Sequence, residues 1–175
     1  MNNAILPPLL GNARPGKADL LVIEADESDG TLARHTPAIS LITNITLDHK
    51  PLEELRPLFS AFATRAQLAT VINADCPECQ VLPRSNGRYV TFSTKDLAAD
   101  YAAENLETTI QGLSFSVNGY PVHMSQPGRH NASNAVAAIA ATAELGVPVA
   151  ESTAALASFR GIHRRLEHVG TTNGI

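Results

Sequence analysis

Acidic side chains follow directly after an aliphatic run near the start of the chain. Leu20–Ile23 is followed by Glu24 and by Asp26-Glu27-Ser28-Asp29, a turn that ends at Gly30. An apolar run of this length without alternation predicts a strand over 18–24, buried on both faces of a parallel sheet. Ligands of open α/β sheets bind beyond the carboxyl ends of the strands. Glu24 and the acidic turn are therefore candidates for chemistry, and a solvated turn that caps the next helix is the alternative.

A second pair of candidate ligands, Asp48 and His49, follows the next predicted strand, over 38–43. If the two strands are neighbours, Glu24 and His49 lie at the same edge of the sheet. A carboxylate and an imidazole at that edge could share one divalent ion, and Mg²⁺ prefers carboxylates and water, with phosphates as further ligands. The alternative for His49 is a residue that simply precedes a helix.

The third candidate site is Gly128-Arg129-His130-Asn131-Ala132-Ser133-Asn134. Asn131 and Asn134 are three residues apart at a predicted helix start, so their side chains share a face. Side-chain amides can read the donor and acceptor edge of a purine, and a helix N-terminus favours anions. Helix capping is the alternative, although one Asn would suffice for it. Arg165 could bind phosphate with two hydrogen bonds, or could belong to a solvated linker.

Helices between aliphatic strands predict an α/β fold, a doubly wound and mostly parallel sheet flanked by helices, with a small antiparallel β meander. The sheet strands are expected at 18–24, 38–43, 69–73 and 89–93, with a helix from Leu52 that Pro57 bends or shortens. The meander strands are expected at 104–109, 113–117 and 120–124, with a hairpin turn at Asn118-Gly119. An Ala-rich helix over 131–145, stopped by Gly146, is expected to pack under the sheet, and a short helix follows at 149–158.

Composition excludes several classes of function. A net charge of -4 with only 13 basic residues in 175 argues against a nucleic-acid surface. No apolar run approaches the roughly 18 residues that span a bilayer, and the N-terminus has no signal-peptide pattern, so a cytoplasmic protein is expected. Cys76 and Cys79 have no second ligand pair, which favours incidental thiols in a loop over a metal or redox site.

Taken together and in this order, the motifs resemble the central ATPase domain of the Mur ligases, the peptidoglycan amino-acid-adding enzymes. The resemblance extends from about Ala18 to Glu167 and is closest to the UDP-N-acetylmuramate–L-alanine ligase branch. It rests on five segments: Leu21–Gly30, Thr43–His49, Asn73–Asp75, Gly128–Asn134 and Gly161–Glu167.

The resemblance implies an ADP-forming ligase that joins L-alanine to UDP-N-acetylmuramate through an acyl phosphate, with ATP and Mg²⁺ as cofactors. It implies that Glu24 and His49 are catalytic magnesium ligands and that Asp26, Glu27 and Ser28 lie near the substrate. It further implies that His130, Asn131 and Asn134 contact the adenine and that Arg165 reaches the phosphates or ribose. The expected partners are small molecules only, with no nucleic acid or membrane, and the oligomeric state stays open.

The sequence departs from the family pattern in two ways, and the first concerns the domain organisation. No G-x-x-G-K-T phosphate loop occurs, and Lys17, Lys50 and Lys95 are the only lysines. We therefore expect a fragment: an irregular segment over 1–17, a central domain without its phosphate loop over 18–160, and a linker toward a missing C-terminal domain over 161–175. This fragment should be inactive alone and bind ATP poorly.

The second departure concerns the acceptor. Several Mur ligases carry a carbamylated Lys on the helix after the Asp-His motif. Residues 52–70 of this chain contain no Lys, and in this respect the chain is similar to the alanine-adding branch. Two alternatives remain: a murein-peptide recycling ligase that adds a tripeptide to the same sugar nucleotide, and a non-catalytic nucleotide-binding module.

Overall fold

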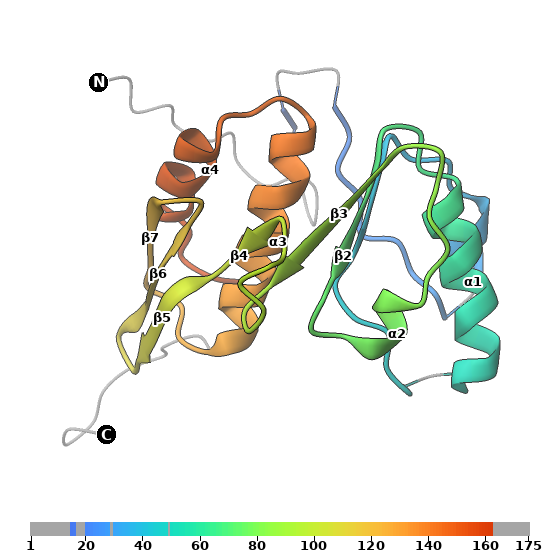
Figure 1. Cartoon of the computed structure of the whole chain (residues 1–175), viewed down its shortest axis with the longest axis horizontal. Helices are drawn as coiled ribbons and strands as arrows, with labels where there is room; N and C mark the ends of the chain where they lie inside the picture. Colours follow the sequence, from blue (N-terminus) through green and yellow to red (C-terminus); the bar gives the residue numbers. More distant parts are fainter. Residues whose placement is uncertain (1–14, 17–19, 29, 49, 163–175) are drawn as a thin grey trace.

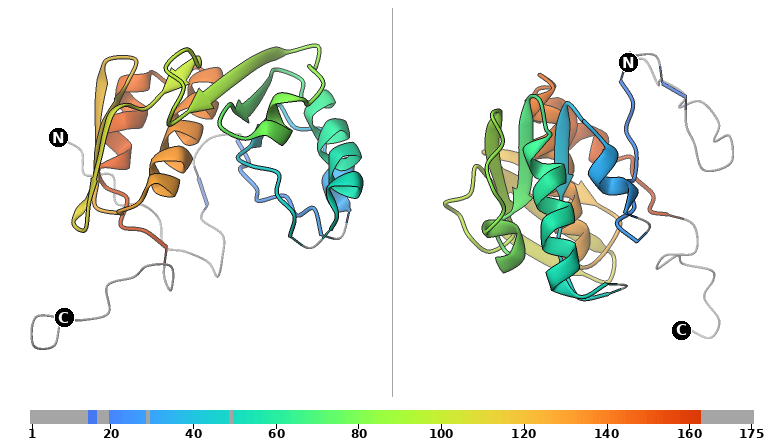
Figure 2. Two further views of the ribbon diagram at one scale, coloured as in Figure 1. Left: turned by 60° about the horizontal axis from the view of Figure 1, so that its bottom comes forward. Right: turned by 90° about the vertical axis from the view of Figure 1, so that its right-hand side faces the viewer.

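The chain folds into stacked layers in the computed structural model, which describes residues 15–16, 20–28, 30–48 and 50–162. Figure 1 shows helix α1 (Leu52–Thr64) on one side of a parallel sheet and helix α3 (Arg129–Glu144) on the other. A smaller antiparallel sheet covers the far side of α3, and the left view of Figure 2 shows the same order of layers. Among the described helices, none has the length and apolar character that crossing a membrane requires.

The parallel sheet has the strand order β1-β2-β3-β4. Its strands are β1 (Ile39–Ile42), β2 (Ala69–Asn73), β3 (Arg88–Ser93) and β4 (Tyr101–Ala102). Every residue of β2 is buried, as the predicted parallel sheet with helices on both faces requires. Successive side chains of a strand point to opposite faces. Accordingly Val71 joins the hydrophobic core that contains α3, and Ile72 joins a separate core that contains α1.

Pro57 was predicted to bend or shorten this helix; helix α1 runs through Pro57 to Thr64, so the shortening is wrong, and the bend stays a prediction. Leu55, Phe62 and Ala63 are buried along one stripe of the helix. Their burial against the sheet outweighs the low helix propensity of one proline. Three short elements were not predicted from the sequence: the 3-10 helix η1 (Thr31–Arg34), helix α2 (Pro77–Gln80) and the edge strand β4.

The antiparallel sheet confirms the predicted meander. Its strands are β5 (Glu104–Thr109), β6 (Gly112–Val117) and β7 (Tyr120–Met124). Asn118 and Gly119 have φ angles of 51° and 80°, the pair of positive values that a two-residue type I′ hairpin turn requires. The turn therefore fixes the register of β6 against β7 locally.

Small residues let α3 pack closely on both neighbouring layers. Its buried side chains are Ala132, Ala135, Val136, Ala137, Ile139 and Ala140. The helix contacts all four strands of the parallel sheet, while helix α4 (Val149–Leu156) packs against α3 and β7. The predicted position of the Ala-rich helix on the sheet is confirmed, and Gly146, with a φ of 85°, follows its end as expected.

The strand expected at 18–24 is wrong over the part that the structure describes. Residues 20–26 have no regular secondary structure. Leu21 and Val22 are 83% and 85% exposed. A buried strand needs a hydrogen-bonded neighbour as well as an apolar sequence, and this run pairs with no strand among the described residues. Glu24 therefore does not stand at a strand end.

Candidate functional site

A pocket of about 320 Å³ lies at the N-terminal end of α3. Its volume falls within the roughly 300–1,000 Å³ of small-molecule sites, and most of its lining is apolar, with a few polar groups, as is usual for such sites. The lining residues come from β7 and the turn after it, from α3, and from α4 and the segment after it: Met124, Gln126, His130, Asn131, Asn134, Ala135, Ala138, Leu156, Phe159, Gly161 and Ile162.

Three of the residues predicted as a nucleotide site meet in this pocket. His130, Asn131 and Asn134 all line it, which confirms that the two asparagines share one face of the helix. The capping alternative does not describe Asn131, because the helix begins at Arg129 with Gly128 as its N-cap and has no side-chain cap bond. Instead the Nδ2 of Asn131 donates a hydrogen bond of 2.7 Å to the backbone carbonyl of Pro127.

The backbone before α3 is shaped around His130. Gly128 has a φ of 102°, and a Cβ at this position would lie 2.7 Å from Cε1 of the His130 ring. Only glycine adopts such a conformation at low cost and leaves room for the ring. The Gly-Arg-His-Asn sequence therefore allows the imidazole to fold back over the backbone at the mouth of the pocket.

The opposite wall of the pocket was not predicted from the sequence. It is formed by the chain after α4, which hydrogen bonds hold against the turn after β7. Gln126 Nε2 donates to the carbonyl of Arg160 at 2.9 Å, and Ser125 Oγ donates to the carbonyl of Phe159 at 3.5 Å. Each pair is separated by 34 residues in sequence, so no local pattern indicates the contact.

The carboxyl ends of β1 and β2 are joined by a second polar cluster. Asn73, at the end of β2, is 8% exposed, and its Nδ2 donates to the carbonyl of Thr43 at 2.8 Å. Its Oδ1 accepts a hydrogen bond from the backbone N–H of Asp75 at 2.8 Å. Because Thr43 begins the segment that leads to Asp48, the Asn73 amide fixes where that segment leaves the sheet.

Asp75 extends this cluster to the end of β3. Its carboxylate accepts hydrogen bonds from the Ser93 hydroxyl and from both the backbone N–H and the hydroxyl of Thr94. Partial burial raises the pKa of Asp75, but these hydrogen bonds, with the charge of Lys95, together hold it below its ordinary value. The carboxylate is therefore ionised and structural at neutral pH.

The two cysteines are buried thiols beside this cluster. Cys76 Sγ lies 3.4 Å from the backbone nitrogen of Ile45, which donates to it. Burial, together with the neighbouring Cys76, raises the pKa of the Cys79 thiol far above its ordinary value. A thiol that keeps its proton is a poor nucleophile and metal ligand, and this applies to Cys79.

The acidic turn lies on the surface. Glu24, Asp26 and Ser28 are exposed, and Glu27 is half-buried. Asp26 Oδ1 accepts a hydrogen bond of 2.7 Å from the Ser28 backbone, which holds the turn in shape. His49 and Arg165, the other predicted site residues, lie outside the described residues.

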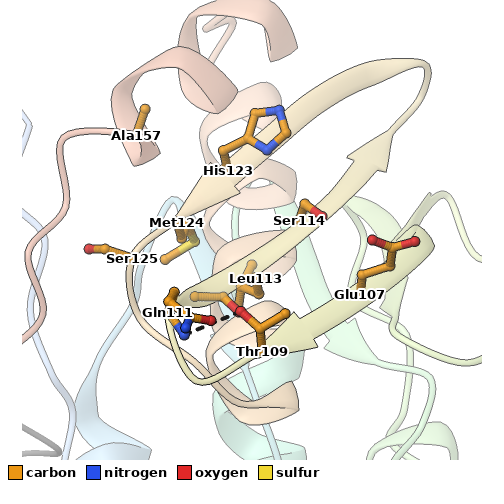
Figure 3. A pocket seen from close by; sticks show the side chains of 10 residues that line it. Glu107, Thr109, Gln111, Leu113, Ser114, His123, Met124, Ser125 and Ala157 are labelled. Atoms are coloured by element: carbon orange, nitrogen blue, oxygen red, sulfur yellow. Dashed lines mark hydrogen bonds between the residues drawn. The ribbon is translucent and has the colours of Figure 1, made fainter. Parts of the chain in front are cut away.

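A second hollow of about 430 Å³ opens on the outer face of the antiparallel sheet (Figure 3). Glu107, Ser114 and His123 stand opposite one another in register across β5, β6 and β7. Figure 3 shows Glu107 and His123 on the two sides of Ser114. The acid and the imidazole are thus separated by a whole strand, and this arrangement is not a catalytic pair.

Comparison with known proteins gives the chain a family. Residues 1–142 match the model of the Mur ligase middle domain. A UDP-N-acetylmuramate–L-alanine ligase from Thermosynechococcus vestitus is 41% identical over 175 residues, which cover 94% of this chain and 36% of that protein. The same-named ligase from Sorangium cellulosum is 40% identical, over 94% of this chain and 37% of its own length. The chain thus spans about a third of the length of these relatives.

Solved structures agree with this grouping. The UDP-N-acetylmuramate-alanine ligase of Thermotoga maritima has a TM-score of 0.71 and 28% identity, over 85% of this chain and 35% of that one. A murein peptide ligase from Psychrobacter arcticus has a TM-score of 0.65 and 25% identity, over 79% of this chain and 30% of that one. The sequence match, the layered fold and the pocket at α3 lead to one conclusion: the chain belongs to the Mur ligase family, of which it carries the middle domain.

Proposed function

We propose that this chain is the nucleotide-binding part of an ATP-dependent ligase that joins L-alanine to UDP-N-acetylmuramate. In this proposal ATP phosphorylates the lactyl carboxylate of the sugar nucleotide, and the amine of L-alanine attacks the acyl phosphate. The observation that carries the proposal is the pocket in which His130, Asn131 and Asn134 come together. Two relatives near 40% identity bear the name of this ligase, which supports the choice of substrates.

The asparagines are proposed to read the base. The Nδ2 of Asn131 is engaged with the carbonyl of Pro127, so the amide is held in one orientation. Its Oδ1 is an acceptor that suits an exocyclic amino group, and the exposed amide of Asn134, one turn later, offers both a donor and an acceptor. Arg165 is proposed to contact the phosphates or ribose, since a guanidinium binds phosphate with two parallel hydrogen bonds.

Magnesium is proposed to bind Glu24 and His49. The described residues contain no group of three or more His, Cys, Asp or Glu that could hold a metal alone. Mg²⁺ is usually held by one or two carboxylates, with waters and substrate phosphates as the other ligands, so the Glu24 carboxylate would supply the kind of donor that this ion prefers. When bound, the ion would neutralise charge between the substrate carboxylate and the phosphates. Asp26, Glu27 and Ser28 are proposed to face the substrate.

The proposed boundaries are those of a middle domain over 18–160, a preceding irregular segment over 1–17 and a linker over 161–175. No phosphate-loop sequence occurs in the chain. We therefore expect the 175-residue chain alone to bind ATP poorly, and calorimetry that detects micromolar binding would contradict this part of the proposal.

The decisive experiment measures turnover of the complete ligase that contains this chain. Glu24→Ala should abolish ADP formation without unfolding the protein, and Asn134→Ala should raise the KM for ATP with a smaller effect on kcat. Wild-type turnover in Glu24→Ala would remove the metal role. Offering L-alanine and the murein tripeptide as acceptors separates the alanine ligase from the recycling ligase, because each enzyme should use its own acceptor.

A further inference from the structure

The pocket at α3 is lined by one phenylalanine, whose exposure is unusual for this protein. Phe159 follows α4 and is 38% exposed, whereas the other four phenylalanines of the chain are buried or half-buried. It lines the pocket on the segment after α4, and Ala135 and Ala138 of α3 line the same pocket. A mostly apolar pocket lined by an aromatic ring, alanine side chains and the amides of Asn131 and Asn134 suits a flat heteroaromatic ring with a polar edge.

The wall that carries Phe159 is held in place by the turn after β7. Gln126 Nε2 donates to the Arg160 carbonyl at 2.9 Å, on the residue next to the phenylalanine. Gly161 then passes so close that a Cβ there would lie 2.6 Å from the Gln126 side-chain amide. With a φ of +90°, Gly161 also has a backbone conformation that other residues rarely adopt. The Gln126 side chain therefore fills the space between the turn after β7 and the segment after α4, and its length sets the distance between them.

We propose that Phe159 is the stacking surface for the nucleobase and that Gln126 is the positioning residue that holds this surface at the correct distance from α3. The inference rests on the proposed function, to which it adds two residues that sequence motifs did not indicate. The aromatic ring supplies contact area to the face of the base, while the amides of Asn131 and Asn134 read its edge. Gln126 acts through the backbone of Arg160, to which its side-chain amide is hydrogen-bonded.

The experiment uses the complete ligase and measures KM for ATP, kcat, and the dissociation constant of a non-hydrolysable ATP analogue by calorimetry. Stacking of a base on an aromatic side chain is worth enough that Phe159→Ala should weaken nucleotide binding about tenfold or more, with kcat little changed. Phe159→Tyr keeps the ring and should retain near wild-type affinity, whereas Phe159→Leu keeps only apolar volume and should not. Inorganic tripolyphosphate, which has no base, should inhibit Phe159→Ala and wild type equally.

Gln126→Ala should also raise KM for ATP, by less than Phe159→Ala, and the double variant should be no worse than Phe159→Ala alone. This non-additivity is expected because Gln126 acts through the phenylalanine. Gln111→Ala, at the exposed turn between β5 and β6, is the matched control and should leave ATP binding unchanged.

Two results would overturn the inference while leaving the proposed function intact. One is Phe159→Ala with wild-type affinity for the ATP analogue. The other is an equal loss for the analogue and for tripolyphosphate, which would indicate a general disturbance of the fold. A wild-type ligase that does not bind the ATP analogue at all would instead refute the proposed function itself.

Discussion

Replacing Asn73 with alanine tests whether one buried amide holds the carboxyl ends of β1 and β2 together. The side chain is 8% exposed and makes two hydrogen bonds of 2.8 Å, to the Thr43 carbonyl and from the Asp75 backbone N–H. Leaving a buried polar group without its partner costs about 1–3 kcal/mol. Thr43 and Asp75 are only half-buried and can partly recover hydrogen bonds to water. We therefore expect Asn73→Ala to lower the free energy of unfolding by about 2 kcal/mol.

The assay is urea unfolding of the 175-residue chain followed by circular dichroism. Hydrogen exchange should also increase in the segment from Thr43 to Asp48, because the tie to β2 is lost. Asn44→Ala is the matched control: this asparagine is exposed, and its side-chain hydrogen bonds are long, 3.3 Å from the Thr43 hydroxyl and 3.5 Å to the Thr46 hydroxyl. Its cost should stay within about 0.5 kcal/mol. Equal stability losses in the two variants would refute the role assigned to Asn73.

Three further predictions concern other parts of the chain. Hydrogen bonds hold the pKa of Asp75 below its ordinary value although burial opposes them. Its carboxylate thus stabilises the fold above the usual aspartate pKa of about 3.9, and this contribution is lost as the pH falls through the lower folded-state value. Asp75→Asn should accordingly flatten the stability profile measured by urea unfolding in that acidic range; an unchanged profile would contradict the assignment. Gly112→Ala should destabilise strongly, since its Cβ would clash with the Met124 carbonyl, whereas Gly119→Ala meets no atom within 4 Å and should cost only about 1 kcal/mol for its positive φ. Finally, Val22→Asp should reduce self-association in sedimentation velocity, because the exposed aliphatic run is a template for contacts between copies; a wild-type chain that stays monomeric at high concentration would exclude this.

Sequence patterns predicted correctly the elements whose conformation depends on residues that are near one another in the chain. The Asn118-Gly119 turn requires positive φ at both residues, which these two types tolerate, and the hairpin formed as expected. Asn131 and Asn134 share a face because the helical period places them there, wherever the helix packs. The five-residue strand β2, with β-branched residues at three consecutive positions and no helical spacing, could be predicted directly as a strand.

The predictions from the sequence were wrong or incomplete where the structure of a segment depends on contacts with residues far away in the chain. Leu20–Ile23 has the composition of a buried strand, yet it remains exposed because no described strand pairs with it. The wall of the pocket depends on Gln126 meeting Arg160 across 34 residues, and no spacing rule covers that distance. Helix α1 continues through Pro57 because tertiary packing outweighs a local penalty.

The parallel sheet divides the interior of the protein into two hydrophobic compartments, and β2 contributes adjacent residues to both. A truncation at Val71 would open space on the α3 side, and the same truncation at Ile72 would open space on the α1 side. Two adjacent positions thus act as separate probes of the two halves. If both truncations lower the melting temperature through one common transition, the halves unfold together; if each broadens a different part of the melting curve, the α3 half can persist while the α1 half comes apart.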